Sequence, residues 1–466
     1  MKRDIKSPLA YGMGAFGHDA FYGMLNGYLM MFVTSVLFAG SSKAYMGRMI
    51  AAVTLILTVV RIGELVFDPM FGGLIDATKS KWGKYRPWII GTSTVSAGLS
   101  LLVFSNFWGL ATSNATLYLM LFTIAFVLFY VAYSIKDIAF WGMLPALSTS
   151  SEERGLIATF ARIGSTIGAN IITFAYVAIL TLFSGSSNFT LGGWFGFIAV
   201  VAGIQVIGSY IAAFGTKENT SAIVNKKTDE KLKISQVIKT LTKNDQLLWT
   251  AVAYLIYGLG LNLTNNLMIY FFRYVIDAQN MWQYVGVIGI ITGFIAIGSF
   301  PLMSKFLKRR QIFIVSVLVV LLAIIIFGFS TNAIVTLGAY VLYNLAQPLV
   351  FMVIVLTITD SVEYGQLKTG QRSEATTSAI RPMTDKLGGA IGGLVVGIVI
   401  PLIGMTGSAT ASDISEGNKI MFRIVAFAVP IVFILVGLAI YMTKVKLTES
   451  RHAEIVKELA LKNREV

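Results

Sequence analysis

Three charged residues lie close together in a segment that is otherwise apolar. The stretch RIGELVFDP (61–69) carries Arg61, Glu64 and Asp68 between two apolar runs. In a helix, Glu64 and Asp68 share one face, and Arg61 lies one turn earlier on nearly the same face. Two carboxylates this close cannot both ionise at low cost in a low dielectric unless a cation or a basic partner sits between them. The spacing predicts a proton or cation site, and the competing interpretation is an ion-pair network that only holds helices together.

A second set of polar residues lies in YSIKDIAFWG (133–142). Asp137 and Trp141 are four residues apart and share a helix face. Sugars bind through hydroxyl groups to carboxylates and guanidinium groups, with an apolar ring face on an aromatic side chain, so this pair could hold a sugar. Trp141 could equally be an interfacial anchor. Lys136 and Asp137 point in different directions along the helix, which predicts different partners for them.

The composition places these charges in a membrane protein. The chain has 466 residues, of which 56% are hydrophobic and 13% charged, with a mean hydropathy of +0.74. It contains no cysteine, which excludes disulfides and thiol-ligated metals. The two histidines, His18 and His452, are too few for a histidine-based metal centre or a Ser-His-Asp set. The glycines of YGMGAFGHD (11–19) match a dinucleotide fingerprint but follow no strand, so packing between helices is the better interpretation.

Apolar stretches of about 20–30 residues predict twelve transmembrane helices. They are expected near 10–37, 47–75, 88–107, 117–146, 155–184, 193–214, 247–276, 283–304, 312–330, 335–359, 375–404 and 419–443. Alternate loops and the two tails contain 27 of the 37 Lys and Arg, against Lys43 alone in the opposite loops. The positive-inside rule therefore predicts that both termini are cytoplasmic, and it explains the net charge of +14 without nucleic acid.

The predicted fold class is all-α: a polytopic membrane protein with twelve transmembrane helices in two six-helix bundles. The expected parts are an N-terminal bundle (1–214), a cytoplasmic central loop (215–246), a C-terminal bundle (247–446) and a cytoplasmic tail helix (447–466).

Several motifs carry a resemblance to a known family over essentially the whole chain. They are FGHDAFYG (16–23), RIGELVFDPMFGGLIDATKSKWGKYRPW (61–88), YSIKDIAFWGMLPALS (133–148), ATFARIGSTIGAN (158–170) and DSVEYGQLKTGQRSEA (360–375). The chain resembles the glycoside–pentoside–hexuronide:cation symporters, and within them the lactose/galactose permeases of lactic-acid bacteria. RPMTDKLGGA (381–390) and LTESRHAEIVKEL (447–459) match the same branch.

The resemblance implies the major facilitator fold and assigns roles to residues. The sugar-binding residues it implies are Asp19, Asp137, Trp141, Arg162 and His18, which stands where melibiose-transporting relatives have a lysine. The cation-coupling residues it implies are Glu64, Asp68 and Lys386. A wider charged network is also expected, made of Arg61, Lys136, Lys368 and Glu374.

Two departures from the family pattern bear on mechanism. The sodium-using branch has a small polar residue before the second acid, but this chain has Phe67, which favours a proton over sodium. The lactose permeases have a histidine where this chain has Gln371, between Lys368 and Glu374. Many of these permeases carry a C-terminal phosphate-accepting domain, and this protein is expected to lack phosphorylation control through such a domain.

The function expected from the sequence is a secondary active transporter of the plasma membrane that couples a galactoside to a cation. The alternative is a sodium- or proton-coupled symporter of another glycoside, such as a pentoside or glucuronide. A channel or a membrane enzyme is disfavoured, since the chain has paired acids on one helix and short loops. No cofactor is implied beyond the co-transported H⁺ or Na⁺; the partners are the sugar and the bilayer, and the oligomeric state is left open.

Overall fold

The computed structural model describes residues 5–186, 189–219, 234–407 and 409–462, and the regular elements in these ranges are all helical. Part of the expected central loop, 220–233, lies outside the described residues. The chain divides into two compact units. The first comprises Met1–Thr228, Phe272–Ile290 and Val396–Ser415, and the second comprises Asp229–Phe271, Ile291–Val395 and Glu416–Val466. The boundaries of the two expected bundles stay a prediction.

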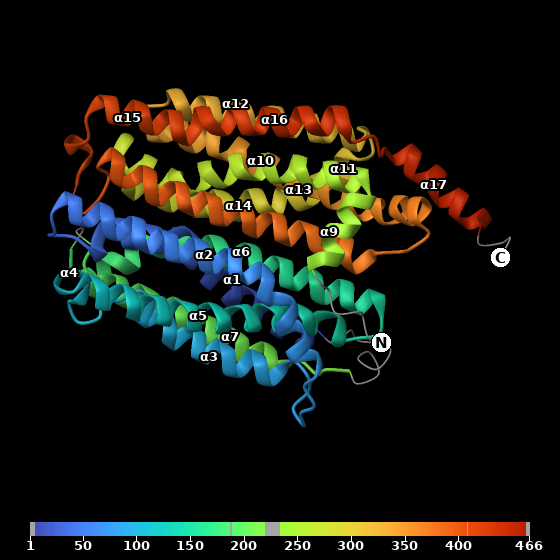
Figure 1. Cartoon of the computed structure of the whole chain (residues 1–466), viewed down its shortest axis with the longest axis horizontal. Coiled ribbons are helices and arrows are strands. Elements are labelled where there is room, and N and C mark those ends of the chain that lie inside the picture. Colours follow the sequence, from blue (N-terminus) through green and yellow to red (C-terminus); the bar gives the residue numbers. More distant parts are fainter. Residues whose placement is uncertain (1–4, 187–188, 220–233, 408, 463–466) are drawn as a thin grey trace. The chain divides into compact units, whose positions relative to one another are not determined.

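The first unit is built on six long helices, drawn in blue to green in Figure 1. They are α1 (Lys6–Phe32, extended by a π-helical turn at Val33–Leu37), α2 (Lys43–Asp76), α3 (Arg86–Val103), α5 (Ala115–Met143), α6 (Ser151–Ser184) and α7 (Leu191–Gly215), with a short α4 (Leu110–Ser113). Polar side chains cap four of them, because Ser42, Asn114, Ser150 and Thr190 accept hydrogen bonds from the first-turn N–H groups of α2, α5, α6 and α7. Helix α1 packs on α6 and α7, and α5 packs on α2 and α3.

The remaining helices begin with α9 and run to the C-terminal tail. They are α9 (Ile234–Lys243), α10 (Asp245–Tyr270), α11 (Gln283–Met303), α12 (Arg309–Phe329), α13 (Ala333–Thr369), α14 (Glu374–Ile403), α15 (Glu416–Arg423), α16 (Val429–Lys444) and α17 (Glu449–Lys462). In the second unit α10 packs on α16, α12 packs on α13, and the tail helix α17 packs on α13.

Eleven of the described helical segments are long and apolar enough to cross a membrane. The twelfth expected span, 88–107, corresponds to α3, which is helical but less apolar because it carries a serine face. Ser93, Ser96 and Ser100 on this face are fully buried, and Gln205 of α7 donates a hydrogen bond to Ser96. Helix α3 therefore hides polar groups against α5 and α7 and lacks the hydropathy of its neighbours.

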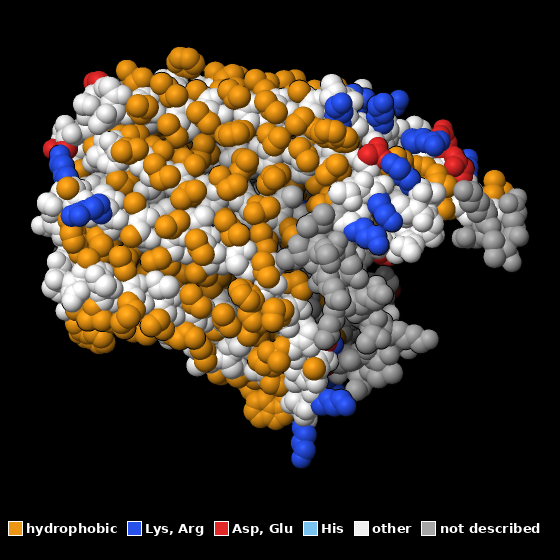
Figure 2. All heavy atoms as spheres, in the orientation of Figure 1, with side chains coloured by type: hydrophobic (Ala, Val, Ile, Leu, Met, Phe, Trp, Pro, Cys, Tyr) orange, Lys and Arg blue, Asp and Glu red, His pale blue; other side chains and the backbone are white. Residues whose placement is uncertain are grey.

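Exposed apolar side chains form a stripe along α2. They recur at helical spacing, at Leu55, Val59, Ile62, Val66 and Met70. Figure 2 shows hydrophobic side chains covering the flanks of the helices, with Lys and Arg gathered toward their ends. Since a hydrocarbon environment favours such a stripe, this face of α2 is suited to contact lipid.

Glycines allow α1 to lie very close to α6 and α7. A Cβ atom at Gly12 would lie 2.9 Å from the backbone oxygen of Phe160, and one at Gly17 would lie 2.7 Å from that of Ile204. A Cβ at Gly164 of α6 would overlap the backbone oxygen of Gly12. The glycines of YGMGAFGHD therefore pack helices together, as the sequence predicts.

We predict that Gly164→Ala destabilises the protein and that Gly98→Ala does not. The methyl group at position 164 meets backbone atoms that cannot rotate away, and such overpacking costs about 1–3 kcal/mol. A Cβ at Gly98, on an exposed face of α3, meets nothing within 4 Å. Thermal unfolding of both variants in detergent measures the difference, and equal midpoints would contradict the close α1–α6 packing.

Candidate functional site

The charged face of α2 lies opposite its apolar stripe and turns toward α5. Ser134 of α5 donates a hydrogen bond to the carboxylate of Asp68. Arg61 lies close enough to Glu64 and to Tyr130 of α5 for their charges and dipoles to interact. The sequence prediction of a shared face is therefore confirmed, and α5 supplies polar groups to that face.

One histidine joins the two adjacent charged residues of α5. The Nζ atom of Lys136 lies 2.5 Å from Nδ1 of His18, and Nε2 of His18 lies 2.9 Å from a carboxylate oxygen of Asp137. Lys136 has no exposed surface and His18 is 2% exposed, whereas the Asp137 side chain is 32% exposed. The expectation that Lys136 and Asp137 have different partners is wrong, because each contacts a different nitrogen of the same imidazole.

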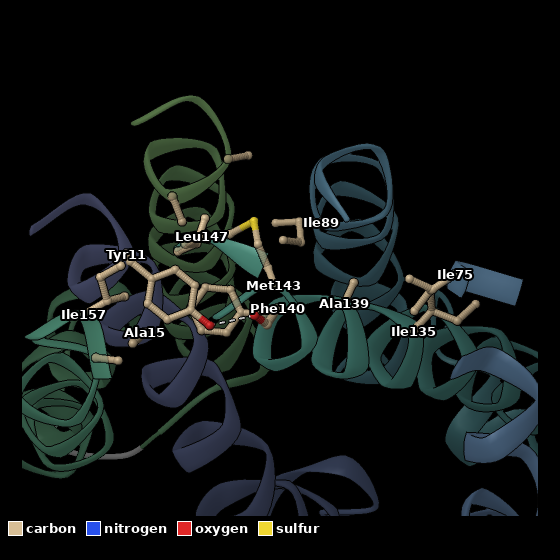
Figure 3. Packing of buried hydrophobic residues seen from close by; sticks show 13 residues of the cluster. Tyr11, Ala15, Ile75, Ile89, Ile135, Ala139, Phe140, Met143, Leu147 and Ile157 are labelled. Atoms are coloured by element: carbon tan, nitrogen blue, oxygen red, sulfur yellow. Dashed lines mark hydrogen bonds between the residues drawn. The ribbon is translucent and has the colours of Figure 1, made fainter. Parts of the chain in front are cut away.

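Aromatic rings enclose His18. Its ring stacks on Phe140, at a centroid distance of 5.2 Å, and on Tyr133, at 6.1 Å. Trp141 meets it edge-on at 5.8 Å. Figure 3 shows Phe140 beside Tyr11 of α1, whose hydroxyl donates a hydrogen bond to the Phe140 carbonyl at 2.6 Å. These contacts hold the histidine of α1 in a fixed place against α5.

Tyr22 of α1 links the α2 acids to the His18 cluster. Its ring stacks on that of Tyr133 at 6.4 Å, and its hydroxyl is close enough to interact electrostatically with Arg61, Glu64 and Asp137. Asp19, one turn before Tyr22 on α1, is within electrostatic reach of Lys136. The first unit therefore brings the predicted sugar and cation residues of α1, α2 and α5 into one polar region.

The other predicted residues lie on helices α6, α13 and α14. Arg162 has an exposed side chain on α6, and Lys386 lies on α14 in the second unit. Lys368 pairs with Asp245, and Glu374 pairs with Arg372 at 3.4 Å. Lys368 and Glu374 therefore take part in ion pairs within the second unit, and the wider network expected from the sequence stays a prediction.

Sequence reasoning missed three polar residues of this region, namely Ser134, Tyr22 and Tyr130. A signal existed for Ser134, because it lies three residues before Asp137 and so on the same side of α5. The tyrosines resembled ordinary residues of an aromatic-rich helix, and only the packing of α1, α2 and α5 distinguishes them.

Long apolar helices that carry paired ionisable groups at membrane depth define a membrane transport protein. The chain belongs to the family described as MFS/sugar transport protein, whose sequence profile matches residues 10–449. It is therefore a multi-span transporter and not an enzyme, as the sequence predicts.

Individual relatives agree with this family. The chain is 41% identical to a lactose permease of Lactobacillus delbrueckii subsp. bulgaricus over 98% of its own length and 73% of the relative's. It is 42% identical to a raffinose carrier protein of Pediococcus pentosaceus over 97% of its own length and 71% of the relative's. These identities confirm the resemblance to the lactic-acid bacterial permeases.

Solved structures confirm the fold. The nucleoside transporter NupG is similar with a TM-score of 0.60 and 16% identity, over 95% of this chain and 100% of that chain. A bacterial homologue of the iron transporter ferroportin is similar with a TM-score of 0.62 and 14% identity, over 96% and 100%. Identities this low show a shared fold alone, which is the expected major facilitator fold.

We predict that Ser134→Ala changes the cation dependence of transport, while Ser134→Thr preserves it. The Ser134 hydroxyl donates a hydrogen bond to the Asp68 carboxylate, and a hydrogen bond to a charged group is worth about 1.5–3 kcal/mol. If Asp68 takes part in proton binding, loss of this hydrogen bond is expected to change the pH dependence of uptake. The measurement is the pH profile of labelled lactose uptake by each variant.

The same pair of variants distinguishes the two cations. If the site binds sodium, loss of the hydroxyl oxygen raises the sodium concentration needed for half-maximal uptake, and the pH profile stays in place. Identical profiles for Ser134→Ala and the unchanged protein would remove Ser134 from the cation site.

Proposed function

We propose that this protein moves galactosides across the plasma membrane by symport with a proton, or by exchange. The observation that carries the proposal is the identity of 41–42%, over nearly the whole chain, to a lactose permease and a raffinose carrier. Lactose and raffinose both contain a galactosyl unit, so a galactoside is the substrate class that the two relatives have in common.

The polar region of the first unit supports a sugar site. Asp137 is a partly exposed carboxylate that shares the contact with His18 with the ring of Trp141. A sugar needs such an acceptor for its hydroxyls and such an aromatic surface for its apolar face. Asp19 is proposed as a second acceptor. Arg162 is proposed as a hydroxyl donor on the motif resemblance and on its exposure on α6.

Glu64 and Asp68 are proposed to carry the coupling proton. They lie on one face of α2, with Arg61 near Glu64 and Ser134 on Asp68. Phe67, which precedes Asp68, is half-exposed and its ring lies near that of Phe71, so this position supplies no oxygen for a sodium ion. Lys386 is also proposed as a coupling residue, on the basis of the motif resemblance.

We predict that Glu64→Gln and Asp68→Asn abolish uphill uptake but retain sugar exchange. Neutral amides cannot bind and release a proton, so sugar movement is uncoupled from the gradient. Labelled lactose uptake into vesicles with an imposed proton gradient, compared with counterflow, measures both activities. The matched control is Glu416→Gln, which alters an exposed carboxylate paired with Lys419 and is expected to transport normally.

Two results would contradict the proposal. Accumulation driven by a sodium gradient but not by a proton gradient would replace the proton with sodium. No accumulation and no counterflow of lactose or raffinose, with uptake of a pentoside or glucuronide, would replace the galactoside.

We further propose that both termini are cytoplasmic, on the basis of the loop charges. The chain has no cysteine, so single cysteines can be labelled without background. A membrane-impermeant maleimide applied to intact cells is expected to label Ser412→Cys but not Lys6→Cys or Arg451→Cys, and permeabilised cells are expected to label all three. Labelling of Arg451→Cys in intact cells would reverse the topology.

A further inference from the structure

Lys136 is a fully buried lysine of the apolar helix α5, and its amino group lies against His18. Burying an ammonium group is costly unless hydrogen bonds replace the lost water. Nδ1 of His18, at 2.5 Å, provides such a bond. The contact with His18 therefore explains the lysine, because burying an apolar side chain at this position would cost less free energy.

This contact determines which nitrogen of His18 carries its proton. A charged lysine has three donors and no acceptor, so Nδ1 of His18 must accept. The proton of the neutral ring then lies on Nε2, which faces the Asp137 carboxylate at 2.9 Å. If the lysine gives its proton to the ring, Nε2 still carries one. In both cases an N–H group points at Asp137.

The surroundings of His18 leave it little freedom. Tyr133, Lys136, Asp137, Phe140 and Trp141 follow one another at helical spacing on α5 and surround the ring on several sides. With 2% exposure and both nitrogens in contact, His18 is poorly placed to bind a sugar directly. Asp137 and Trp141 are the exposed members of the cluster, at 32% and 39%.

We propose that Lys136 and His18 are positioning residues: Lys136 sets the tautomer of His18, and His18 orients Asp137 and Trp141 for sugar recognition. The role in sugar recognition rests on the proposed function, whereas the contacts among Lys136, His18 and Asp137 do not. His18, which the sequence predicts as a sugar ligand, then orients the sugar-binding residues and does not itself contact the sugar.

Histidine NMR tests the geometry without any sugar. Because the chain has two histidines, ¹⁵N-histidine labelling yields two sets of ring signals, and His452→Gln assigns them. The chain of contacts from Lys136 through His18 to Asp137, called the relay below, predicts that Nε2 of His18 carries a proton. It also predicts that Lys136→Met changes the ring signals of His18. A bare Nε2, or signals unaffected by Lys136→Met, would overturn the relay whatever the substrate is.

Counterflow of labelled lactose tests whether Lys136 and His18 affect the affinity for sugar. Lys136→Met and His18→Phe, which keeps the stacked ring but removes both nitrogens, are each expected to raise the half-saturation concentration about 10-fold, as for loss of one charge-assisted hydrogen bond. The maximal rate should change less than twofold. The double variant should be no worse than either single variant, because both changes break the same chain of contacts.

His18→Gln provides the matched rescue. Its side-chain oxygen can accept from Lys136 while its amide N–H donates to Asp137, so affinity should stay near that of the unchanged protein. Loss of affinity in His18→Phe without loss in Lys136→Met would make His18 a direct ligand and overturn the proposal. Additive losses together with lowered thermal midpoints would reduce both residues to a structural role. Absence of lactose counterflow in the unchanged protein would instead contradict the proposed function, and the NMR result would still decide the relay.

Discussion

The first unit depends on one constraint: a charge at membrane depth must find a partner inside the protein, because lipid offers none. Lys136 and Asp137 satisfy this constraint on the two sides of one imidazole, and Asp68 satisfies it on the Ser134 hydroxyl. Such hydrogen bonds require donor and acceptor atoms within about 3 Å. Helices α1, α2 and α5 must therefore be held in a narrow range of positions by the packing around them.

Small residues make that packing possible. Glycines of α1 and α6 bring the two backbones into direct contact, which sets the height and rotation of α1. His18 and Asp19 are thereby presented to α5 on the same helix whose glycines face α6 and α7. A bulkier α1 would keep its histidine outside hydrogen-bonding range of Lys136. One face of α1 therefore packs against α6 and α7, and another face carries the polar residues that contact α5.

Helix α5 connects the proposed cation and sugar sites. Ser134 donates a hydrogen bond to Asp68, and Asp137, three residues later, contacts His18. One turn of α5 therefore makes both contacts. Coupling between the two ligands is reciprocal by thermodynamic necessity, and a shared helix is a direct physical route for it.

Sequence reasoning reached much of this arrangement. Helical spacing alone placed Glu64 and Asp68 together, and hydropathy located the spans, including α3 despite its serine face. It was wrong about Lys136 and Asp137, because spacing along one helix says where side chains point but not what a second helix puts between them. It did not predict the ion pairs of Lys368 with Asp245 and of Glu374 with Arg372.

By itself, the sequence determined the class of protein, the apolar segments that contain the charges and the helix faces on which the acids lie. These properties follow from composition and helical period, which act within single segments of the chain. The tertiary structure decided which groups meet: Ser134 with Asp68, and Lys136 with Asp137 through His18. Those contacts depend on the rotation and spacing of separate helices, and they join residues that are 66 and 118 positions apart in the sequence.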